Sequence, residues 1–341
     1  MSGAGEGPRA LPRVFGHGEA MATLERAARG GRLPHAWLFA GPPRVGKATV
    51  AWRFAAWLLA GQPPAPAGKG PLWLPTEAGS AGAAAVRRVI AGGHPDLLSV
   101  APQAEPGRRR IIPVEALRAA RQFLALTAAE GGYRVVLVDE AEGMEAASAN
   151  ALLKTLEEPP PRTVIILVTA APGRLLPTLR SRCRRLDFFP LPAPELQGWI
   201  AEALPGLDAP ARAELAALAD GAPGQALELA EGEGVELARL AAETLAALPD
   251  AAGAHALADR IAGREAATAF RTFFTLLGRA LTAAVRAAAR GEPAPAWLGA
   301  RPLAAWAEAA AAVERLVAET ERLSLDRRQA VLGAIETLRG R

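Results

Sequence analysis

Five short runs of apolar residues stand out in the first 190 residues, each bounded by turn residues or by a stretch with helical spacing. Within each run the apolar positions are mostly continuous, which is typical of strands buried on both faces of a parallel sheet. The predicted strands are residues 36–40, 97–101, 134–139, 164–169 and 186–189. The pattern therefore predicts an α/β domain with a five-stranded parallel sheet covered by helices.

Helical spacing occupies much of the sequence between these runs. A helix is expected at 50–60, and another is expected to begin at Pro113 and to end at Gly131-Gly132. The helix after the third strand should stop at Pro159, because proline lacks the backbone N–H and clashes with the preceding turn. Helices and strands therefore alternate along this part of the chain.

Only helical patterns follow residue 190. They are short and amphipathic at first, and they become longer from about Glu236. Stripes of phenylalanine and leucine at helical spacing in 266–290 predict core or subunit contacts and not a cofactor site. We therefore divide the chain into three predicted domains, which are residues 1–190, 191–235 and 236–341.

The composition is that of a globular protein. Of 341 residues, 50% are hydrophobic and 22% are charged, and the formal net charge of +4 is a mild basic bias. Cys183 is the only cysteine, which excludes an intrachain disulfide and a cysteine-based zinc cluster, so no zinc is expected. The sequence has no apolar signal segment and no run of 18 apolar residues, so we expect a cytoplasmic protein that does not enter a membrane.

A glycine-bounded loop follows the first predicted strand and leads directly into a helix. Gly41 and Gly46 enclose four residues and Lys47 comes next, which is the spacing of a phosphate-binding loop. Backbone N–H groups of such a loop face phosphate oxygens, and the lysine reaches them as a point charge. The next residue is Ala48, where a Ser or Thr hydroxyl normally holds Mg²⁺. Thr49 lies one residue late and about 100° round the helix, so ATP and Mg²⁺ are expected to bind weakly at most.

Two carboxylates close the third predicted strand. Asp139 would hold Mg²⁺, directly or through water, and Glu140 would polarise an attacking water. Thr169, at the end of the fourth strand, is placed to contact a γ-phosphate or that water. The alternative is that both acids only begin a helix, where carboxylates favour the positive end of the dipole. The upstream phosphate-loop spacing favours the chemical interpretation. A basic turn at 107–110 is a further candidate, for nucleic-acid contact.

These motifs, in this order, resemble the AAA+ ATPase family and, within it, the bacterial clamp-loader subunits. GPPRVGKAT resembles the Walker A motif, VVLVDEAE the Walker B motif, and Thr169 the first sensor. SANALLKTLEEPP and LLPTLRSRC are the most specific segments, because they are typical of clamp loaders and not of AAA+ proteins in general. HPDLLSVAP and LSLDRRQAVL resemble the delta-prime type of subunit. The resemblance implies an AAA+ domain, a small helical lid and a C-terminal helical collar for the three predicted domains.

The sequence departs from the family pattern at several positions. The family's four-cysteine zinc module would lie near 61–82, a Pro-, Gly- and Ala-rich stretch predicted to be an irregular and partly disordered loop. Ala48 replaces the magnesium-binding hydroxyl, and Gly224 falls where ATP-hydrolysing relatives carry an arginine. Arg44 puts a long side chain into the phosphate loop. These departures predict that this chain itself hydrolyses little or no ATP.

The resemblance implies a role in an asymmetric complex. Arg182, in the Ser-Arg-Cys triplet, would be an arginine finger that stabilises charge on a neighbouring subunit's γ-phosphate. The implied partners are gamma/tau-like and delta-like clamp-loader subunits, the sliding clamp and primer-template DNA, within the replicative DNA polymerase III holoenzyme. Two alternatives stay open, which are a gamma/tau-like ATP-hydrolysing motor subunit and a structural scaffold without nucleotide chemistry.

Overall fold

The computed structural model describes residues 7–11, 13–77, 79–103, 110–231, 233–263 and 267–340. They form two compact units, and the first contains the described residues up to Gln225 while the second begins at Ala226. Within these ranges, no helix combines the length and the apolar character that a bilayer span requires. The predicted basic turn lies outside the described residues except for Arg110.

A parallel sheet of five strands is the centre of the first unit, in the order β2-β3-β4-β1-β5. The strands are β1 (Ala36–Ala40), β2 (Leu97–Val100), β3 (Arg134–Val138), β4 (Thr163–Thr169) and β5 (Arg184–Asp187). The three inner strands β3, β4 and β1 are buried along their whole length, as their continuous apolar runs predict. The predicted fold class, an α/β fold on a five-stranded parallel sheet, is confirmed.

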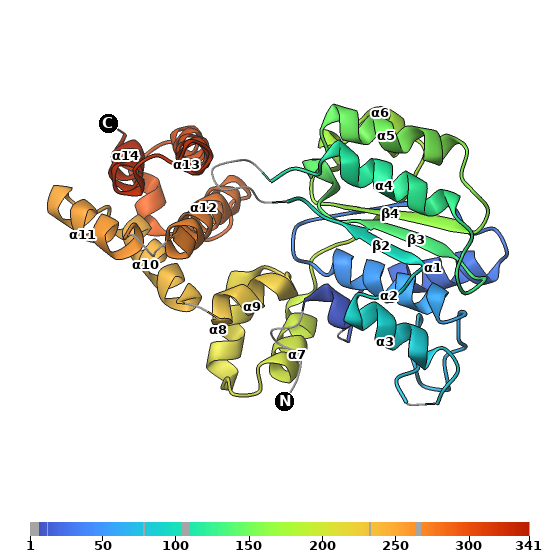
Figure 1. The fold of residues 1–341 in the computed structure, drawn as a ribbon. Coiled ribbons are helices and arrows are strands. Elements are labelled where there is room, and N and C mark those ends of the chain that lie inside the picture. Colours follow the sequence, from blue (N-terminus) through green and yellow to red (C-terminus); the bar gives the residue numbers. More distant parts are fainter. Residues whose placement is uncertain are drawn as a thin grey trace. The chain divides into compact units, whose positions relative to one another are not determined.

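Helices cover both faces of this sheet (Figure 1). One face packs against α1 (Gly18–Arg29), α2 (Lys47–Leu59) and α3 (Ala83–Ala91). The other face packs against α4 (Val114–Ala125), α5 (Ala146–Glu157) and α6 (Pro177–Arg180). Each face therefore has its own apolar core, and parallel strands joined by helical crossovers require this layered arrangement.

The two outer strands differ from their prediction. Only Val100 is buried in β2, because this strand has a neighbour on one side alone. Strand β5 begins at Arg184 and not at Leu186, and it is mostly exposed. It pairs with β1 from Arg184, which is opposite Trp37, to Asp187. The next residue, Phe188, is buried. The predicted strand 186–189 was therefore displaced, because sheet pairing and not hydrophobicity sets the limits of an edge strand.

Helix α4 ends at Ala125, several residues before the predicted end at the glycine pair. The backbone N–H groups of Ala129 and Glu130 donate to the two carboxylate oxygens of Asp96, at 2.8 and 3.0 Å. The guanidinium of Arg134 donates a hydrogen bond to the carbonyl oxygen of Phe123, in the last turn of α4. Because these side chains satisfy the backbone groups, the chain turns away from the helix at this point.

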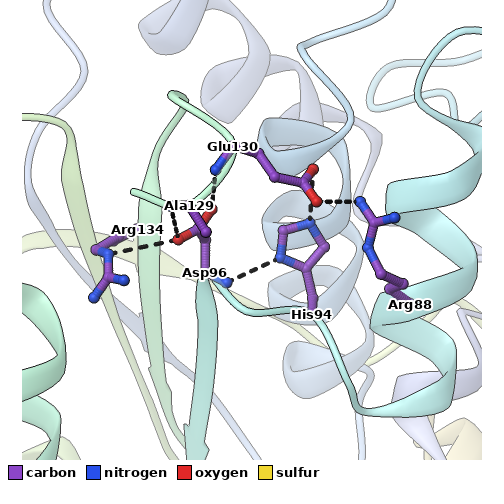
Figure 2. Close-up of polar contacts among 6 residues, drawn as sticks. All are labelled: Arg88, His94, Asp96, Ala129, Glu130 and Arg134. Carbon is purple, nitrogen blue, oxygen red and sulfur yellow. Dashed lines mark hydrogen bonds and ion pairs between the residues drawn. The ribbon is translucent and has the colours of Figure 1, made fainter. Parts of the chain in front are cut away.

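Figure 2 shows the polar cluster around Asp96, which lies just before β2. The Asp96 side chain is 1% exposed, and the Nε atom of Arg134 lies 3.5 Å from its Oδ1 atom. His94 accepts a hydrogen bond at Nδ1 from the Asp96 backbone N–H, and its Nε2 atom lies 3.7 Å from a carboxylate oxygen of Glu130. Glu130 is also paired with Arg88 on α3. The cluster thus joins α3, β2, β3 and the loop after α4.

The rest of the first unit contains short helices and one long loop. The helices are α7 (Ala193–Ala203), α8 (Ala209–Ala219) and the start of α9 (Pro223–Glu231), and all three agree with the sequence prediction. The described part of 61–82 has no helix or strand, as predicted. Leu72 and Leu74 of this loop are nevertheless buried in the core beside α2, so apolar anchors hold it on the first unit.

Among the residues that the structure describes, the second unit contains helices and the turns and loops that connect them. Its further helices are α10 (Gly234–Ala246), α11 (Ala251–Ile261), α12 (Ala267–Ala289), α13 (Leu303–Leu323) and α14 (Arg327–Arg339). The phenylalanine stripe of α12 is buried, with Phe273 and Phe274 in edge-to-face contact at 5.2 Å. This confirms the prediction of core contacts. The division into three domains remains a prediction.

Candidate functional site

The sheet topology brings three of the predicted site residues to one end of the strands. Strand β4 lies between β1 and β3, so its last residue, Thr169, stands between the loop that starts at Gly41 and the turn that starts at Asp139. The register pairs Thr169 with Ala40, the residue before Gly41. We call this the carboxyl end of the sheet. Open α/β sheets bind ligands at this end.

The phosphate-like loop needs its two glycines. Gly41 has a φ of +156°, and a Cβ atom there would lie 2.2 Å from the Phe188 carbonyl oxygen. Gly46 has a φ of +110°, a conformation that other residues rarely adopt, and α2 begins at the next residue. Both glycines are therefore required for the turn itself, and Gly46 releases the chain into the helix with its first N–H groups directed at the loop.

Lys47 is turned toward its own loop. It is 6% exposed, and its Nζ atom donates to the Gly41 carbonyl at 2.8 Å and to the Pro42 carbonyl. Burial lowers the pKa of Lys47, while the charges of Glu142 and Asp139 act in the opposite direction. The lysine is thus within electrostatic reach of both acids, but its hydrogen bonds are made inside the loop.

The residues present fit a phosphate group better than they fit Mg²⁺. Gly41, Gly46 and Lys47 form a cradle of the expected shape, whereas Ala48 offers no oxygen and Thr49 is half-buried in the first turn of α2. In the described ranges, no group of three or more His, Cys, Asp or Glu side chains is arranged to hold a metal ion. We therefore derive no step through a magnesium ion at this site.

Asp139 and Glu140 have different surroundings. Asp139 is half-buried, and burial raises the pKa of its carboxyl group, which accepts the Glu140 backbone N–H at 2.9 Å. Glu140 has a left-handed backbone, with a φ of +45°, and its exposed side chain is paired with Arg110 at 3.2 Å. The Glu140 carboxylate is thus directed to a surface arginine, whereas Asp139 is within electrostatic reach of Lys47. The geometry therefore favours Asp139 over Glu140 as the acid that belongs to the candidate site.

Glu142 is a third acid at this end of the sheet that the sequence interpretation missed. Its Oε1 atom accepts the Ala170 backbone N–H at 3.0 Å, while its Oε2 atom is buried and has no hydrogen-bond partner in the part of the chain that the structure describes. Thr169 is 1% exposed, and its hydroxyl accepts the Ala171 N–H at 3.1 Å. Glu142 therefore links the turn after β3 to the residue after Thr169. In the sequence, the one indication that Glu142 belongs to the candidate site is that it follows Asp139 by three residues.

His17 is the second missed residue. It precedes α1, and its Nε2 atom lies 2.7 Å from the Val45 carbonyl oxygen of the phosphate-like loop. Its ring contacts Phe188 edge-on at 5.1 Å. Burial lowers the pKa of His17, against the opposing effects of the Val45 carbonyl and Glu195. A neutral imidazole that donates to Val45 fits this geometry, and it fixes the outer part of the loop.

Gly224 lies against the phosphate-like loop. Its backbone N–H donates to the Arg44 carbonyl at 3.1 Å, and a Cβ atom at Gly224 would lie 3.2 Å from the Arg44 Cβ atom. The first turn of α9 thus contacts the loop through backbone atoms, and a bulkier residue here would require one side to move. Arg44 adopts a left-handed conformation, with a φ of +63°.

Arg182 lies at the opposite end of the sheet. It follows α6 and comes two residues before Arg184, which is paired with Trp37 near the start of β1. Trp37 is four residues before Gly41, which in a strand corresponds to about 13 Å. Arg182 therefore comes just before the end of β5 that lies beside the start of β1, whereas the phosphate-like loop follows the last residue of β1. The predicted site residues thus form two groups, one at each end of the sheet.

The arginines next to Arg182 have local partners. Arg184 lies over the ring of Trp37 at 5.7 Å, and Arg185 is paired with Asp187 at 2.7 Å. Cys183 is half-buried, and burial raises the pKa of its thiol to about 12. A thiol with that pKa stays protonated at neutral pH, so Cys183 is unsuited to act as a nucleophile.

Taken together, a glycine-bounded loop with a buried lysine, a following helix and an acid after a neighbouring strand define a P-loop protein of the α/β class. Residues 16–192, just over half of the chain, match the family described as DNA polymerase III, delta subunit. The chain belongs to this family.

Individual relatives agree with this assignment. DNA polymerase III subunit delta′ of Pseudomonas aeruginosa is 40% identical over 60% of this chain and 59% of its own length. The Escherichia coli subunit delta′ is 34% identical, over 62% and 58%. Among solved structures, a gamma subunit-related protein of Thermotoga maritima covers 94% of this chain and 99% of its own, at 18% identity and a TM-score of 0.43.

The matched segments thus span about three fifths of the length of the two delta′ relatives. The predicted resemblance to delta-prime subunits of AAA+ clamp loaders is confirmed. The gamma/tau alternative is not favoured, although a gamma/tau subunit of Mycobacterium bovis is 31% identical over 57% of this chain and 31% of its own length.

Proposed function

We propose that this chain is a delta-prime-like clamp-loader subunit of the DNA polymerase III holoenzyme that supplies Arg182 as an arginine finger to a neighbouring subunit. Its partners would be gamma/tau-like and delta-like subunits, with the sliding clamp and primer-template DNA as the substrates of the whole complex. The names of its relatives support assembly with other DNA polymerase III subunits. The position of Arg182 supports its action on a nucleotide that a neighbouring subunit binds.

The observation that carries the proposal is the separation of Arg182 from the chain's own phosphate-like loop, at opposite ends of one rigid sheet. A guanidinium is always charged and offers a planar fork of donors that suits phosphate oxygens. Arg182 is about a third exposed, so a second molecule can reach it. An arginine in this position has no route to a nucleotide in its own loop, and it is available to one held by an adjacent subunit.

The chain's own loop supports the other half of the proposal, that hydrolysis by this subunit is negligible. Lys47 donates to loop carbonyls, Ala48 lacks a hydroxyl, and Gly224 lacks a side chain that could reach a γ-phosphate. Weak nucleotide binding is compatible with the remaining N–H groups. The purified chain should turn over ATP far below about 1 s⁻¹, the lower end of ordinary enzyme rates. Steady-state turnover at that rate or above would contradict this part of the proposal.

The finger is tested in the reconstituted complex. Arg182→Ala should assemble normally and should lower DNA-stimulated ATP hydrolysis and clamp loading by one site's share, because the other sites keep their own fingers. An arginine finger is worth about 10³–10⁵ in rate at the site it serves. Arg182→Lys should recover little, since an ammonium cannot reproduce the planar fork.

Arg180→Ala is the matched control for this test. Arg180 is an exposed arginine of the same basic cluster, so its removal changes the local charge equally. The control variant should behave as the wild type. Wild-type rates for Arg182→Ala across ATP concentrations would favour a structural scaffold without nucleotide chemistry.

A further inference from the structure

We infer that Glu157 is a positioning residue for Arg182, which deepens the proposed finger function and rests on it. The Nη2 atom of Arg182 lies 2.7 Å from the Oε1 atom of Glu157. Its Nη1 atom donates to the Thr178 carbonyl at 3.0 Å. The two anchors come from different elements, since Glu157 is the last residue of α5 and Thr178 belongs to α6.

Two anchors fix the plane of a guanidinium as well as its position. They use two of the five N–H donors of Arg182, so the remaining donors stay available for the phosphate oxygens of a second molecule. A free arginine side chain would have to lose its rotamer freedom when it meets the phosphate, whereas a side chain already held in place loses less. Glu157 and Thr178 thus present the finger in a fixed orientation.

The placement of Glu157 is itself unusual for a helix. Helix α5 ends at this residue, and Pro159 follows closely, so the Glu157 carboxylate stands at the negative end of the helix dipole. A carboxylate is unfavourable there unless a cation offsets it. Arg182 supplies that cation. The last turn of α5 lies near the start of β1, where His35 contacts the Leu156 carbonyl at 3.0 Å, so the helix end is fixed to the sheet. The backbone that carries Glu157 is therefore held in place beside Arg182.

The pair is suited to positioning and contributes little to folding. The Glu157 side chain is 51% exposed and that of Arg182 is 36% exposed. Exposed ion pairs of this kind change stability very little. A replacement of Glu157 should therefore leave folding and assembly intact, and any effect on the rate of the complex can be assigned to the orientation of the finger.

The experiment compares Glu157→Gln with Glu158→Gln in the reconstituted complex. Both residues are exposed and adjacent, and both changes remove one negative charge, but only Glu157 contacts Arg182. The finger-dependent rate of each protein is defined as its ATPase rate minus the rate of the Arg182→Ala complex. Glu157→Gln should lower this rate roughly two- to five-fold relative to the wild type, as expected from loss of an exposed charged contact. Glu158→Gln should leave it unchanged.

Two further measurements separate positioning from a general structural effect. The loss in Glu157→Gln should be in kcat, with an unchanged apparent KM for ATP, because the finger acts in the transition state. In the Arg182→Ala background, Glu157→Gln should cause no additional loss, since no finger is left to orient. An additive loss would overturn the inference, because it would mean that Glu157 acts independently of Arg182.

The outcomes also distinguish the inference from the function on which it rests. If Arg182→Ala has the wild-type rate, the proposed finger function itself is wrong. If Arg182→Ala is slower but Glu157→Gln equals the wild type or Glu158→Gln, the finger stands and the positioning role is overturned. A faster rate for Glu157→Gln also overturns it, because Glu157 would then restrain the finger.

Discussion

The two ends of the sheet both hold carboxylates that are at least partly buried, but they differ in how fully those carboxylates are paired. At the amino end, Asp96 accepts two backbone N–H groups and lies beside Arg134. At the carboxyl end, and among the described residues, Asp139 accepts only the backbone N–H of the next residue, and Glu142 has a buried oxygen without a hydrogen-bond partner. The fully paired acid has the surroundings of a structural residue, whereas the underpaired acids have those expected of a ligand site.

This difference shows how burial alone misleads. Asp96 is more deeply buried than Asp139, but its carboxylate accepts two backbone N–H groups. Hydrogen bonds to a carboxylate offset the free energy that burial costs it, and Asp96 has those bonds. Incomplete pairing of the carboxylates, and not the depth of their burial, is therefore the feature that makes this end of the sheet the candidate site.

The largest effect is expected for Asp96→Ala. The change leaves two N–H groups unpaired and the charge of buried Arg134 uncompensated, so the free energy of unfolding should fall by about 3–5 kcal/mol. Urea denaturation of the full chain measures it. Asp187→Ala, which removes an exposed acid at the end of β5, is the control and should cost less than about 1 kcal/mol. Equal effects of the two changes would contradict the structural role of Asp96.

The second prediction concerns pH and His94. Burial lowers the pKa of His94, against Glu130 and Asp96 and in the same direction as Arg88. The unfolded chain therefore binds a proton more readily, and stability present above pH 6.5 should be lost as the pH falls below that value. The slope is at most about 1.4 kcal/mol per pH unit for one histidine.

His94→Gln should flatten this loss of stability, measured by thermal unfolding between pH 7.5 and 5. His17 at the carboxyl end also has a pKa lowered by burial, so the double variant should be flatter still. An unchanged slope after replacement of His94 would show that its neutral form is not required by the fold.

The third prediction moves to Asp139. Burial raises the pKa of its carboxyl group, so the ionised form opposes folding at neutral pH, and this unfavourable contribution should diminish as the pH falls. Asp139→Asn keeps an oxygen for the Glu140 N–H and removes the charge. Stability at pH 7 should therefore be unchanged or higher, by less than about 1 kcal/mol. A clear loss of stability would place Asp139 with Asp96 as a structural acid.

The sequence was sufficient for the parts of the fold that are locally encoded. The buried runs at 36–40 and 134–139 and the glycines of the loop determined the inner strands and the phosphate-like turn correctly. The displaced limits of β5 and the early end of α4 depend on pairing with β1 and on the Asp96 carboxylate. Those partners are distant in the sequence, so no local pattern could reveal them.

The same reason limited the prediction of the site. Gly41, Lys47, Asp139 and Thr169 lie at one end of the sheet because strand order places them there, and the spacing motifs identified them. Glu142 and His17 belong to the site through contacts with Ala170 and Val45, which no motif records. The anchoring of Arg182 by Glu157 likewise joins segments whose proximity only the fold determines.

The smallest effect is expected for Glu142→Gln, which separates its two oxygens. The glutamine Oε1 can still accept the Ala170 N–H, so the link to β4 should remain and the free energy of unfolding should change by less than about 0.5 kcal/mol. The change removes a negative charge that raises the pKa of Asp139. The pKa of Asp139 should therefore decrease, as measured by a carbon-13 NMR titration of its carboxyl group. An unaltered Asp139 titration would mean that Glu142 acts only through its bond to Ala170. The charge of Glu142 would then have no influence on the pKa of Asp139, and the two acids would be electrostatically independent.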